Sequence, residues 1–221
     1  MTSEESEPAP ADTDTASALG LIRRHARAFV AFNAGYYGLV LAGMLIGGLN
    51  PSIRDILSEA VKKAVTEGPL QSVGSAYGGG KFLWAFVLTF LINLIAGSLL
   101  TISVPSAIIP FSGLLLAAWR AILWGLLFTP VNHPLGLGLY VHFVTLLLEG
   151  QAYILAAFAA YIHGRSFLAP RSMGAMSHGQ GYVLGIKHSA RVYLLVTVLL
   201  LIAALYESFT GIYIIPALLP A

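Results

Sequence analysis

The chain has 221 residues, of which 57% are hydrophobic and only 10% are charged, and its mean hydropathy is +0.80. A soluble domain usually has about 25% charged residues, so this composition excludes a soluble globular domain, a disordered chain and a nucleic-acid-binding protein. The chain has no cysteine, which excludes disulfides, thiolate metal sites and cysteine nucleophiles. The composition predicts an all-α, polytopic bundle of membrane-spanning helices.

The N-terminal segment differs from the rest of the chain in composition. Residues 1–20 are rich in Ser, Thr, Pro and Ala, and they hold five of the ten acidic residues and no Lys or Arg. They have almost nothing to bury, which predicts a disordered acidic tail. Residues 21–221 are then expected to form one integral membrane domain with a basic charge balance.

Five apolar segments follow the tail, each close to the roughly 20 residues that a helix needs to cross the hydrocarbon core. The predicted spans cover residues 28–49, 82–104, 107–128, 136–162 and 192–215. Lipid offers no partner to an unpaired backbone group, so all five are expected to be helices. The lipid bilayer is therefore the first partner that the sequence predicts.

An amphipathic segment separates the first two spans. Between residues 52 and 65, apolar residues recur at helical spacing on one face, and charged residues occupy the other face. Pro51 stands where a helix can begin. The pattern favours an interfacial helix that lies on the membrane surface. The alternative is a small soluble cap that packs on the bundle.

An irregular, proline-marked turn is expected between the second and third spans. Pro105 and Pro110 each remove a backbone donor and disfavour a helix immediately before them, and Gly113 follows. A tight hairpin between two helices is the favoured interpretation. The alternatives are a short re-entrant element and a broken helix of the kind that binds substrate in transporters.

The basic residues predict the orientation of the chain in a cell membrane. Three arginines at 23–27 precede the first span, and four cations between residues 165 and 191 separate the fourth span from the fifth, with no acid among them. With five spans, these two groups fall on the same side, which the positive-inside rule assigns to the cytoplasm. We therefore expect the N-terminus inside and the C-terminus outside.

Three charged residues lie inside the predicted spans: Arg120, Glu149 and Glu207. Such residues are expensive in lipid and are expected to face the protein interior. Arg120 and Glu149 have matching depths, which predicts that they pair. His142 and Tyr153 share the helical face of Glu149, so the five residues are expected to form an intramembrane polar cluster.

Two interpretations of this cluster carry about equal weight. One is an ion or proton pathway or a ligand site, and the other is a polar clamp that fixes helix packing. A metal site is disfavoured, because His142 and Glu149 lie about 10 Å apart along the helix axis. No catalytic residue, metal or cofactor is predicted, since no hydrolase motif is present and the 172–181 segment fits a flexible linker better than a phosphate loop.

Small residues in the first span predict close helix packing. Gly43 and Gly47 form a G-x-x-x-G step, which lets two helix backbones approach each other. The step favours tight packing within the chain over a specific dimer.

Three stretches of the sequence resemble a known family. They are FLINLIAGSLLTI at 90–102 with Asn93, LEGQAYILAAFAAYIHG at 148–164 with Glu149 and Gly164, and LIAALYESFTG at 201–211 with Glu207. On these residues the chain resembles the stage II sporulation protein M family of bacterial and archaeal membrane proteins. The family usually has a His one turn before the Glu that Glu149 matches, whereas His142 lies two turns away.

The resemblance implies a helical membrane protein without known enzymatic activity, whose namesake recruits peptidoglycan-remodelling enzymes to the septum. We therefore expect a non-enzymatic scaffold or complex subunit in a prokaryotic cell membrane. Its partners would be membrane or peripheral proteins, or further copies of the chain in a homo-oligomer. The alternative function is a small permease or channel-like component that moves an ion, a proton or a small solute through the polar cluster.

Overall fold

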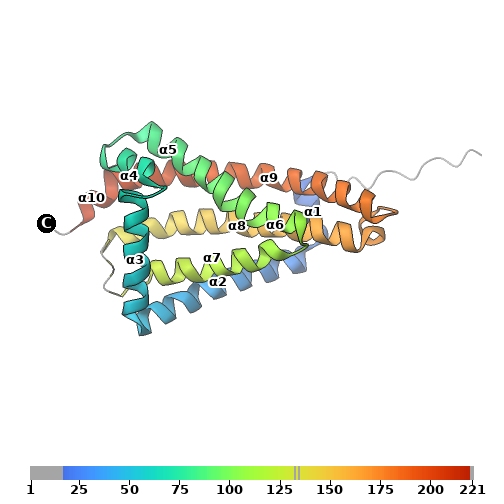
Figure 1. Ribbon diagram of the computed structural model, residues 1–221, viewed down its shortest axis with the longest axis horizontal. Helices are drawn as coiled ribbons and strands as arrows, with labels where there is room; N and C mark the ends of the chain where they lie inside the picture. The colour runs from blue at the N-terminus through green and yellow to red at the C-terminus, as the bar shows by residue number, and fades with distance from the viewer. Residues whose placement is uncertain (1–16, 132, 134, 220–221) are drawn as a thin grey trace, which may run out of the picture.

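The computed structural model describes residues 17–131, 133 and 135–219, and this part of the chain contains helices and no strands. The long helices lie side by side along one axis, and α3 crosses one end of the bundle (Figure 1). In chain order the elements are α1 (Ala18–Arg24), α2 (Ala26–Leu49), α3 (Pro51–Thr66), α4 (Gln71–Gly78), α5 (Phe82–Leu91), the π-helical segment η2 (Ile92–Ser103), α6 (Val104–Ile108), α7 (Ser112–Leu127), α8 (Gly138–Leu168), the 3-10 turn η3 (Pro170–Met173), α9 (His178–Phe209), the π-helical turn η4 (Thr210–Ile214) and α10 (Ile215–Leu218).

Four helical stretches are long and apolar enough to cross a membrane. They are Ala26–Leu49, Phe82–Ile108, Gly138–Leu168 and Pro170–Leu218. The predicted third span, 107–128, corresponds to α7, an apolar helix of only 16 residues. At 1.5 Å per residue α7 is about 24 Å long, which is shorter than a hydrocarbon core of about 30 Å. The difference arises because residues 109–111 form the turn before α7 and the helix ends before Phe128.

Several predicted boundaries shift. The predicted tail lies outside the described residues up to position 16, but its last residues belong to α1, because the Ser17 hydroxyl accepts a hydrogen bond from the Gly20 N–H at 3.0 Å. The 172–181 segment is not a linker throughout, since α9 begins at His178. There Ser177 accepts from the Gln180 N–H, and the Gln180 side chain accepts from the Met176 N–H.

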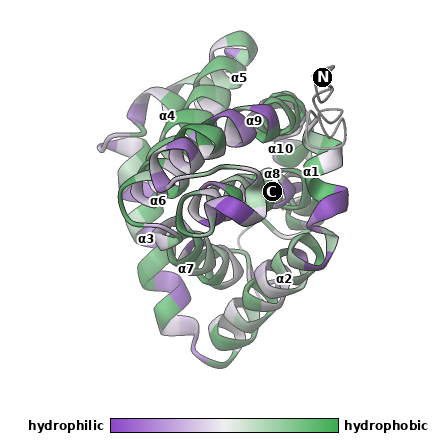
Figure 2. Cartoon of the chain, turned by 90° about the vertical axis from the view of Figure 1, so that its right-hand side faces the viewer, coloured by the Kyte–Doolittle hydropathy of each residue, from purple (hydrophilic) through white to green (hydrophobic). Residues whose placement is uncertain are grey.

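Helix α8 forms the centre of the bundle and is the element with the longest run of buried residues. Residues 152–160, an alanine-rich stretch around Tyr153 and Phe158, are all buried, because small side chains let the surrounding helices approach. The outer surface is apolar instead, as expected for helices in lipid; Leu115 and Leu194 are 75% and 69% exposed. Hydrophobic residues make up much of every long helix, as the end-on view coloured by hydropathy shows (Figure 2).

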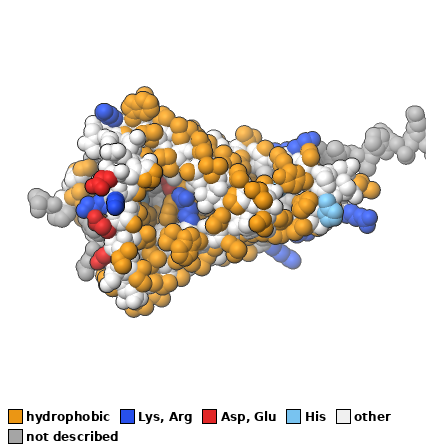
Figure 3. All heavy atoms as spheres, viewed as in Figure 1, with side chains coloured by type: hydrophobic (Ala, Val, Ile, Leu, Met, Phe, Trp, Pro, Cys, Tyr) orange, Lys and Arg blue, Asp and Glu red, His pale blue; other side chains and the backbone are white. Residues whose placement is uncertain are grey.

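Charged side chains gather at the two ends of the molecule, and an apolar belt lies between them (Figure 3). Arginines 23–27 and the α8–α9 connection lie at one end, and α3 and the C-terminal end of α9 lie at the other (Figure 1). The two basic groups in the sequence therefore share one end of the bundle.

Helices α2 and α7 pack at backbone distance through the glycines of the predicted step. A Cβ atom on Gly43 would lie 2.3 Å from the Ile122 carbonyl oxygen, and one on Gly47 would lie 2.2 Å from the Thr129 hydroxyl oxygen. On the opposite helix, a Cβ on Gly125 would lie 2.0 Å from the Val40 carbonyl oxygen. The step thus serves packing between two helices of the same chain.

The connection between α6 and α7 is a tight hairpin turn. Phe111 adopts a left-handed backbone with φ of 70°, and the Ser106 hydroxyl accepts a hydrogen bond from the Gly113 N–H at 2.8 Å. A Cβ on Gly113 would lie 1.9 Å from the Ile102 carbonyl oxygen, so only glycine lets the two helices meet here. Gly164 of α8 makes room for the Phe111 ring at the same turn.

Candidate functional site

A chain of hydrogen bonds connects three helices in the middle of the bundle. Arg120 of α7 donates to the Tyr153 hydroxyl of α8 at 2.8 Å, and this hydroxyl donates to the Asn93 side-chain oxygen of η2 at 2.9 Å. The Asn93 amide then donates to Glu149 of α8 at 2.5 Å. Asn93 thus occupies the position between the cation and the carboxyl group.

Aromatic rings and a glycine hold the Arg120 end of this chain. The guanidinium carbon lies 4.0 Å from the centroid of the Tyr153 ring and 5.0 Å from that of Trp124, which is cation–π geometry. Gly97 of η2 leaves the space for both side chains, because a Cβ there would lie 2.8 Å from the Tyr153 hydroxyl and 3.3 Å from an Arg120 nitrogen.

The direct ion pair predicted between Arg120 and Glu149 is absent from the described ion pairs. Matching depth is not enough for such a pair, since the rotation of each helix decides where its side chains point. Arg120 points to Tyr153, one turn further along α8 than Glu149. Among the described residues, the hydrogen bonds that start at Arg120 reach this carboxyl group through Tyr153 and Asn93.

Glu207 joins Glu149 from the neighbouring helix α9. The two carboxyl groups lie within hydrogen-bonding contact of each other. Glu149 is only 5% exposed. The cluster therefore holds two carboxyl groups and one guanidinium group, and the guanidinium group is not the direct partner of either carboxyl group.

These carboxyl groups line a cavity of about 430 Å³. A hollow next to α3, with a cationic side chain visible inside it, opens on the face shown in Figure 3. The polar lining of the cavity also includes His142 and Asn93, and its aromatic lining includes Trp124. The remaining lining comes from α3, the segment that leads into α4, α5, the ends of α7 and α8, and the loop between them: Ser58, Val61, Val65, Leu70, Val73, Thr89, Ile92, Leu127, Phe128, His133, Thr145 and Leu146.

One polar atom on the cavity wall has no partner among the described residues. Thr145 is 2% exposed, and its hydroxyl oxygen makes no hydrogen bond there. Thr145 lies one helical turn before Glu149, so both side chains share a face of α8. A buried hydroxyl group without a partner is costly, which marks this wall as a place where a ligand group fits.

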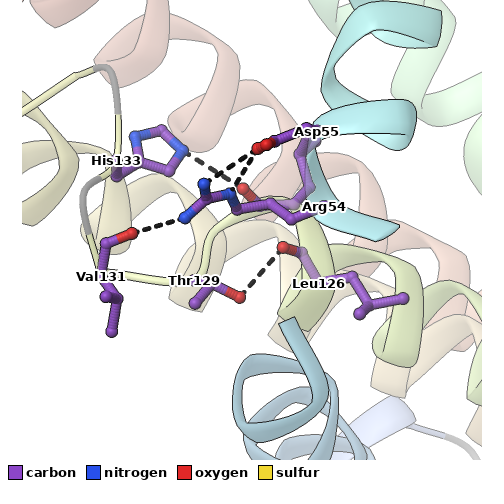
Figure 4. Close-up of polar contacts among 7 residues, drawn as sticks. Arg54, Asp55, Leu126, Thr129, Val131 and His133 are labelled. Carbon is purple, nitrogen blue, oxygen red and sulfur yellow. Dashed lines mark hydrogen bonds and ion pairs between the residues drawn. The ribbon is translucent and has the colours of Figure 1, made fainter. Parts of the chain in front are cut away.

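Helix α3 forms the roof of the cavity and is held there by Arg54. The Arg54 guanidinium donates to the Val131 carbonyl oxygen in the loop after α7 and also contacts Asp55 at 2.9 Å (Figure 4). The Arg54 side chain is only 12% exposed. Val61 and Val65, about two and three turns further along α3, then face the cavity.

Two hydrogen bonds hold His133, in the loop beside α3, in its neutral form. Its Nδ1 accepts from the Leu135 N–H at 3.1 Å, and its Nε2 lies 3.2 Å from the Leu127 carbonyl oxygen, to which it therefore donates. This arrangement requires the neutral ring. Burial lowers the pKa of His133, and the Arg54 charge lowers it further, while the bond to the Leu127 carbonyl opposes the shift.

The other predicted residues take different positions. His142 lines the cavity with its ring 4.6 Å from that of Phe128, so it shares the cavity with Glu149 but is not part of the hydrogen-bonded chain. Gly164 packs at the α6–α7 turn, away from the polar cluster. Only the family resemblance singles out Asn93 in the sequence, and nothing there marks Thr145. Val61 and Val65 belong to the apolar face of the predicted 52–65 helix, but the pattern does not indicate that they line a cavity.

The arrangement suits binding of a ligand that donates hydrogen bonds. Glu149, Glu207, Asn93 and Thr145 line the cavity with polar side chains, and aromatic and branched apolar side chains make up most of the remaining lining. Among the described residues, no group of three or more His, Asp and Glu side chains is close enough to hold a metal ion.

Comparison of the chain with protein-family models, curated proteins and solved structures gives no match.

Proposed function

We propose that the chain is a small permease-like membrane component that binds a cationic organic solute in the cavity beneath α3. The observation that carries the proposal is the pair of carboxyl groups, Glu149 and Glu207, at the cavity wall without a direct cationic partner. Two carboxyl groups in a site of low dielectric attract a cation strongly. The proposal assigns no catalytic reaction to the chain.

The shape and lining of the cavity favour an organic ammonium ion over a bare metal ion. A volume of about 430 Å³ is in the range of small-molecule sites. Val61, Val65 and Leu70 offer an apolar surface, and Trp124 and Phe128 offer aromatic rings. An ammonium group would reach the carboxyl groups and the Thr145 hydroxyl, while its hydrocarbon part would contact these walls.

The contact between the two carboxyl groups also supports exchange of the solute for a proton. A carboxylate is only an acceptor, so a hydrogen bond between Glu149 and Glu207 needs one proton on the pair. An ammonium ion that enters between them replaces this proton as the positive charge. Binding would therefore release a proton.

The finer topology belongs to the same proposal. We take α7 as a fifth membrane-embedded helix, because it is apolar and packs along α2. The basic end of the bundle then lies in the cytoplasm of a prokaryotic cell, and the C-terminus lies outside. Helix α3 would lie at the outer membrane surface, where it covers the cavity.

A second candidate function is the scaffold that the resemblance to the stage II sporulation protein M family implies. The charged face of α3 favours it, because Asp55, Glu59 and Lys62 have side chains 66%, 73% and 70% exposed. A partner protein, or another copy of the chain in a homo-oligomer, could dock there. In this reading Arg120, Glu149 and Glu207 only lock the bundle.

Fluorescence of Trp124 in the purified chain tests the permease proposal. Trp84→Phe and Trp119→Phe remove the other two tryptophans, which are 60% and 59% exposed. Titration with benzylammonium should change the Trp124 emission, and Glu149→Gln should weaken binding by about 2–5 kcal/mol, the range for truncating a buried charge partner. Glu59→Gln on the outer face of α3 is the matched control.

The two candidate functions predict different results for Glu149→Gln. The permease proposal predicts a folded chain with weak binding of benzylammonium. The scaffold predicts loss of stability or of co-purifying proteins, and no binding by the parent chain. A parent chain that does not respond to benzylammonium at millimolar concentration would rule out the proposed solute class.

A further inference from the structure

A second cavity lies between three of the four long helical stretches. Its volume is about 240 Å³, and its lining residues come from positions 99–107 of η2 and α6, 160–163 of α8 and 186–193 of α9. None of these residues lines the cavity beneath α3. Val104 and Ile186 on its walls are 45% and 50% exposed, so the cavity borders the apolar outer surface of the bundle. We call it the α6–α9 groove.

The hydroxyl groups of the α6–α9 groove have hydrogen-bond partners within the protein. The Ser103 and Tyr193 hydroxyl oxygens lie 2.5 Å apart and bond each other. The Ser189 hydroxyl donates to the Ala159 carbonyl oxygen at 2.9 Å. These three side chains are therefore satisfied without a ligand.

The polar side chain of the groove that lacks such a partner is His163. This residue is 6% exposed, and its Nε2 is buried with no hydrogen-bond partner in the described part of the chain. The ring hydrogen-bonds to the backbone of Ser106 in α6, and this bond is made by Nδ1, because Nε2 has no partner. When Nδ1 donates to the Ser106 carbonyl oxygen, Nε2 of the neutral ring is an acceptor. A protonated ring would be costly among the apolar walls.

Neighbouring residues hold the His163 ring in this position. The Tyr182 ring of α9 packs edge-on against it with ring centroids 4.7 Å apart, and the Tyr182 hydroxyl donates to the Ala107 carbonyl oxygen at 3.3 Å. A Cβ on Gly185 would lie 2.7 Å from the His163 Cδ2, so this glycine leaves the space for the ring. The groove thus presents a fixed, buried acceptor that lacks a donor, which is a costly arrangement unless a ligand supplies one.

We propose that the α6–α9 groove binds a small hydrophobic alcohol that is dissolved in the bilayer. The hydroxyl group of the alcohol would donate to His163 Nε2, and its hydrocarbon part would contact Val104 and Ile186. A cavity of about 150 Å³ accommodates benzene, so about 240 Å³ suits a molecule of roughly nine or ten heavy atoms. An ion is disfavoured, because none of the described residues that line the groove is charged.

Photolabelling of the full chain in nanodiscs tests the site. The probe is an octanol that carries a diazirine group, and peptide mass spectrometry locates its adducts. We expect adducts within 99–107 and 186–193 or at His163. Adducts spread evenly over the exposed residues of the long helices would mean contact with the bilayer alone, and would overturn the proposal.

Competition identifies the hydroxyl group as the recognised feature. Heptyl methyl ether has the same number of heavy atoms as 1-octanol but cannot donate a hydrogen bond. At concentrations corrected for partitioning into the bilayer, 1-octanol should suppress the labelling at an about two- to tenfold lower concentration, the range for one hydrogen bond. Equal potency of the alcohol and the ether would mean a groove for any hydrocarbon chain, and would overturn the proposal.

A histidine variant assigns the acceptor. His163→Leu should abolish the preference for the alcohol over the ether. His178→Leu is the matched control, because His178 lies at the exposed start of α9 and outside the groove, and it should keep the preference. A preference that persists in His163→Leu would overturn the assignment. The comparison in the parent chain decides the proposal even if His163→Leu does not fold.

Discussion

The packing of α2 on α7 makes a quantitative prediction with an internal control. Gly43→Ala and Gly38→Ala are the same substitution on the same helix, five residues apart. A Cβ on Gly43 would lie 2.3 Å from the Ile122 carbonyl oxygen and 3.0 Å from the Gly125 Cα, whereas a Cβ on Gly38 meets nothing within 4 Å. Only the first variant should force the helices apart.

The expected difference follows from these distances. Relief of the Gly43 clash requires a separation of about 1 Å, which forfeits a quarter to a half of each dispersion contact along the seam. Overpacking of this kind destabilises proteins by about 1–3 kcal/mol. The helix propensity of alanine is common to both variants and cancels in the comparison. Gly43→Ala should therefore be about 1–3 kcal/mol less stable than Gly38→Ala.

Thermal unfolding in mild detergent, followed by helical circular dichroism or by loss of the monodisperse peak, measures this difference. Gly125→Ala, whose Cβ would lie 2.0 Å from the Val40 carbonyl oxygen, should behave like Gly43→Ala. Equal stability of Gly43→Ala and Gly38→Ala would refute the α2–α7 contact. A variant that dissociates from an oligomer without unfolding would assign the glycines to an interface between chains.

Three other changes test the polar site and its roof. Arg120→Gln should lower the free energy of unfolding by about 0.5–2 kcal/mol, because the cation–π contact with Tyr153 is lost. It should also tighten benzylammonium binding, measured by the Trp124 fluorescence titration, since a positive charge leaves the site; weaker binding would contradict this. Arg54→Ala should release α3 from Val131 and speed proteolysis of α3, whereas Lys63→Ala should not; equal rates would contradict the anchor. The pKa of His133 is lowered by burial, so the fold favours the neutral ring, and the His133 contribution to stability should be constant above pH 6.5 and fall below it. Unfolding at pH 7.5 and 5.5 should therefore show that His133→Gln loses less stability between the two pH values than the parent chain does.

The helical architecture follows from the sequence because lipid leaves the backbone no other choice. Apolar segments near 20 residues long locate the four long stretches, and the alanine-rich run after Glu149 indicates the tightly packed helix. Helix ends are less predictable. Ser17 and Ser177 extend α1 and α9 through side-chain caps, which hydropathy does not register. The π-helical geometry of η2 also has no signal in composition.

The candidate site could be predicted only in part. Charge in an apolar background singled out Arg120, Glu149 and Glu207, since such residues are rare in lipid. Their partners depend on the rotation of each helix, which depth along the sequence does not give. Tyr153 therefore takes Arg120, and Asn93 reaches Glu149. The position of α3 over the cavity depends on contacts with residues distant in the sequence, such as that of Arg54 with Val131, which no local pattern encodes.

The chain has no native cysteine, so a single Thr145→Cys variant reports directly on whether the cavity attracts cations. Its thiol would stand on the cavity wall, one turn from Glu149. The measurement is the ratio of its labelling rates with a cationic and an anionic methanethiosulfonate of equal size, both of which react with the same thiolate. A cation-binding cavity should give a cationic preference of about tenfold or more, as in negatively charged clefts, and this preference should be lost on adding Glu149→Gln. Equal rates, or faster labelling by the anionic reagent, would contradict a cation-binding cavity.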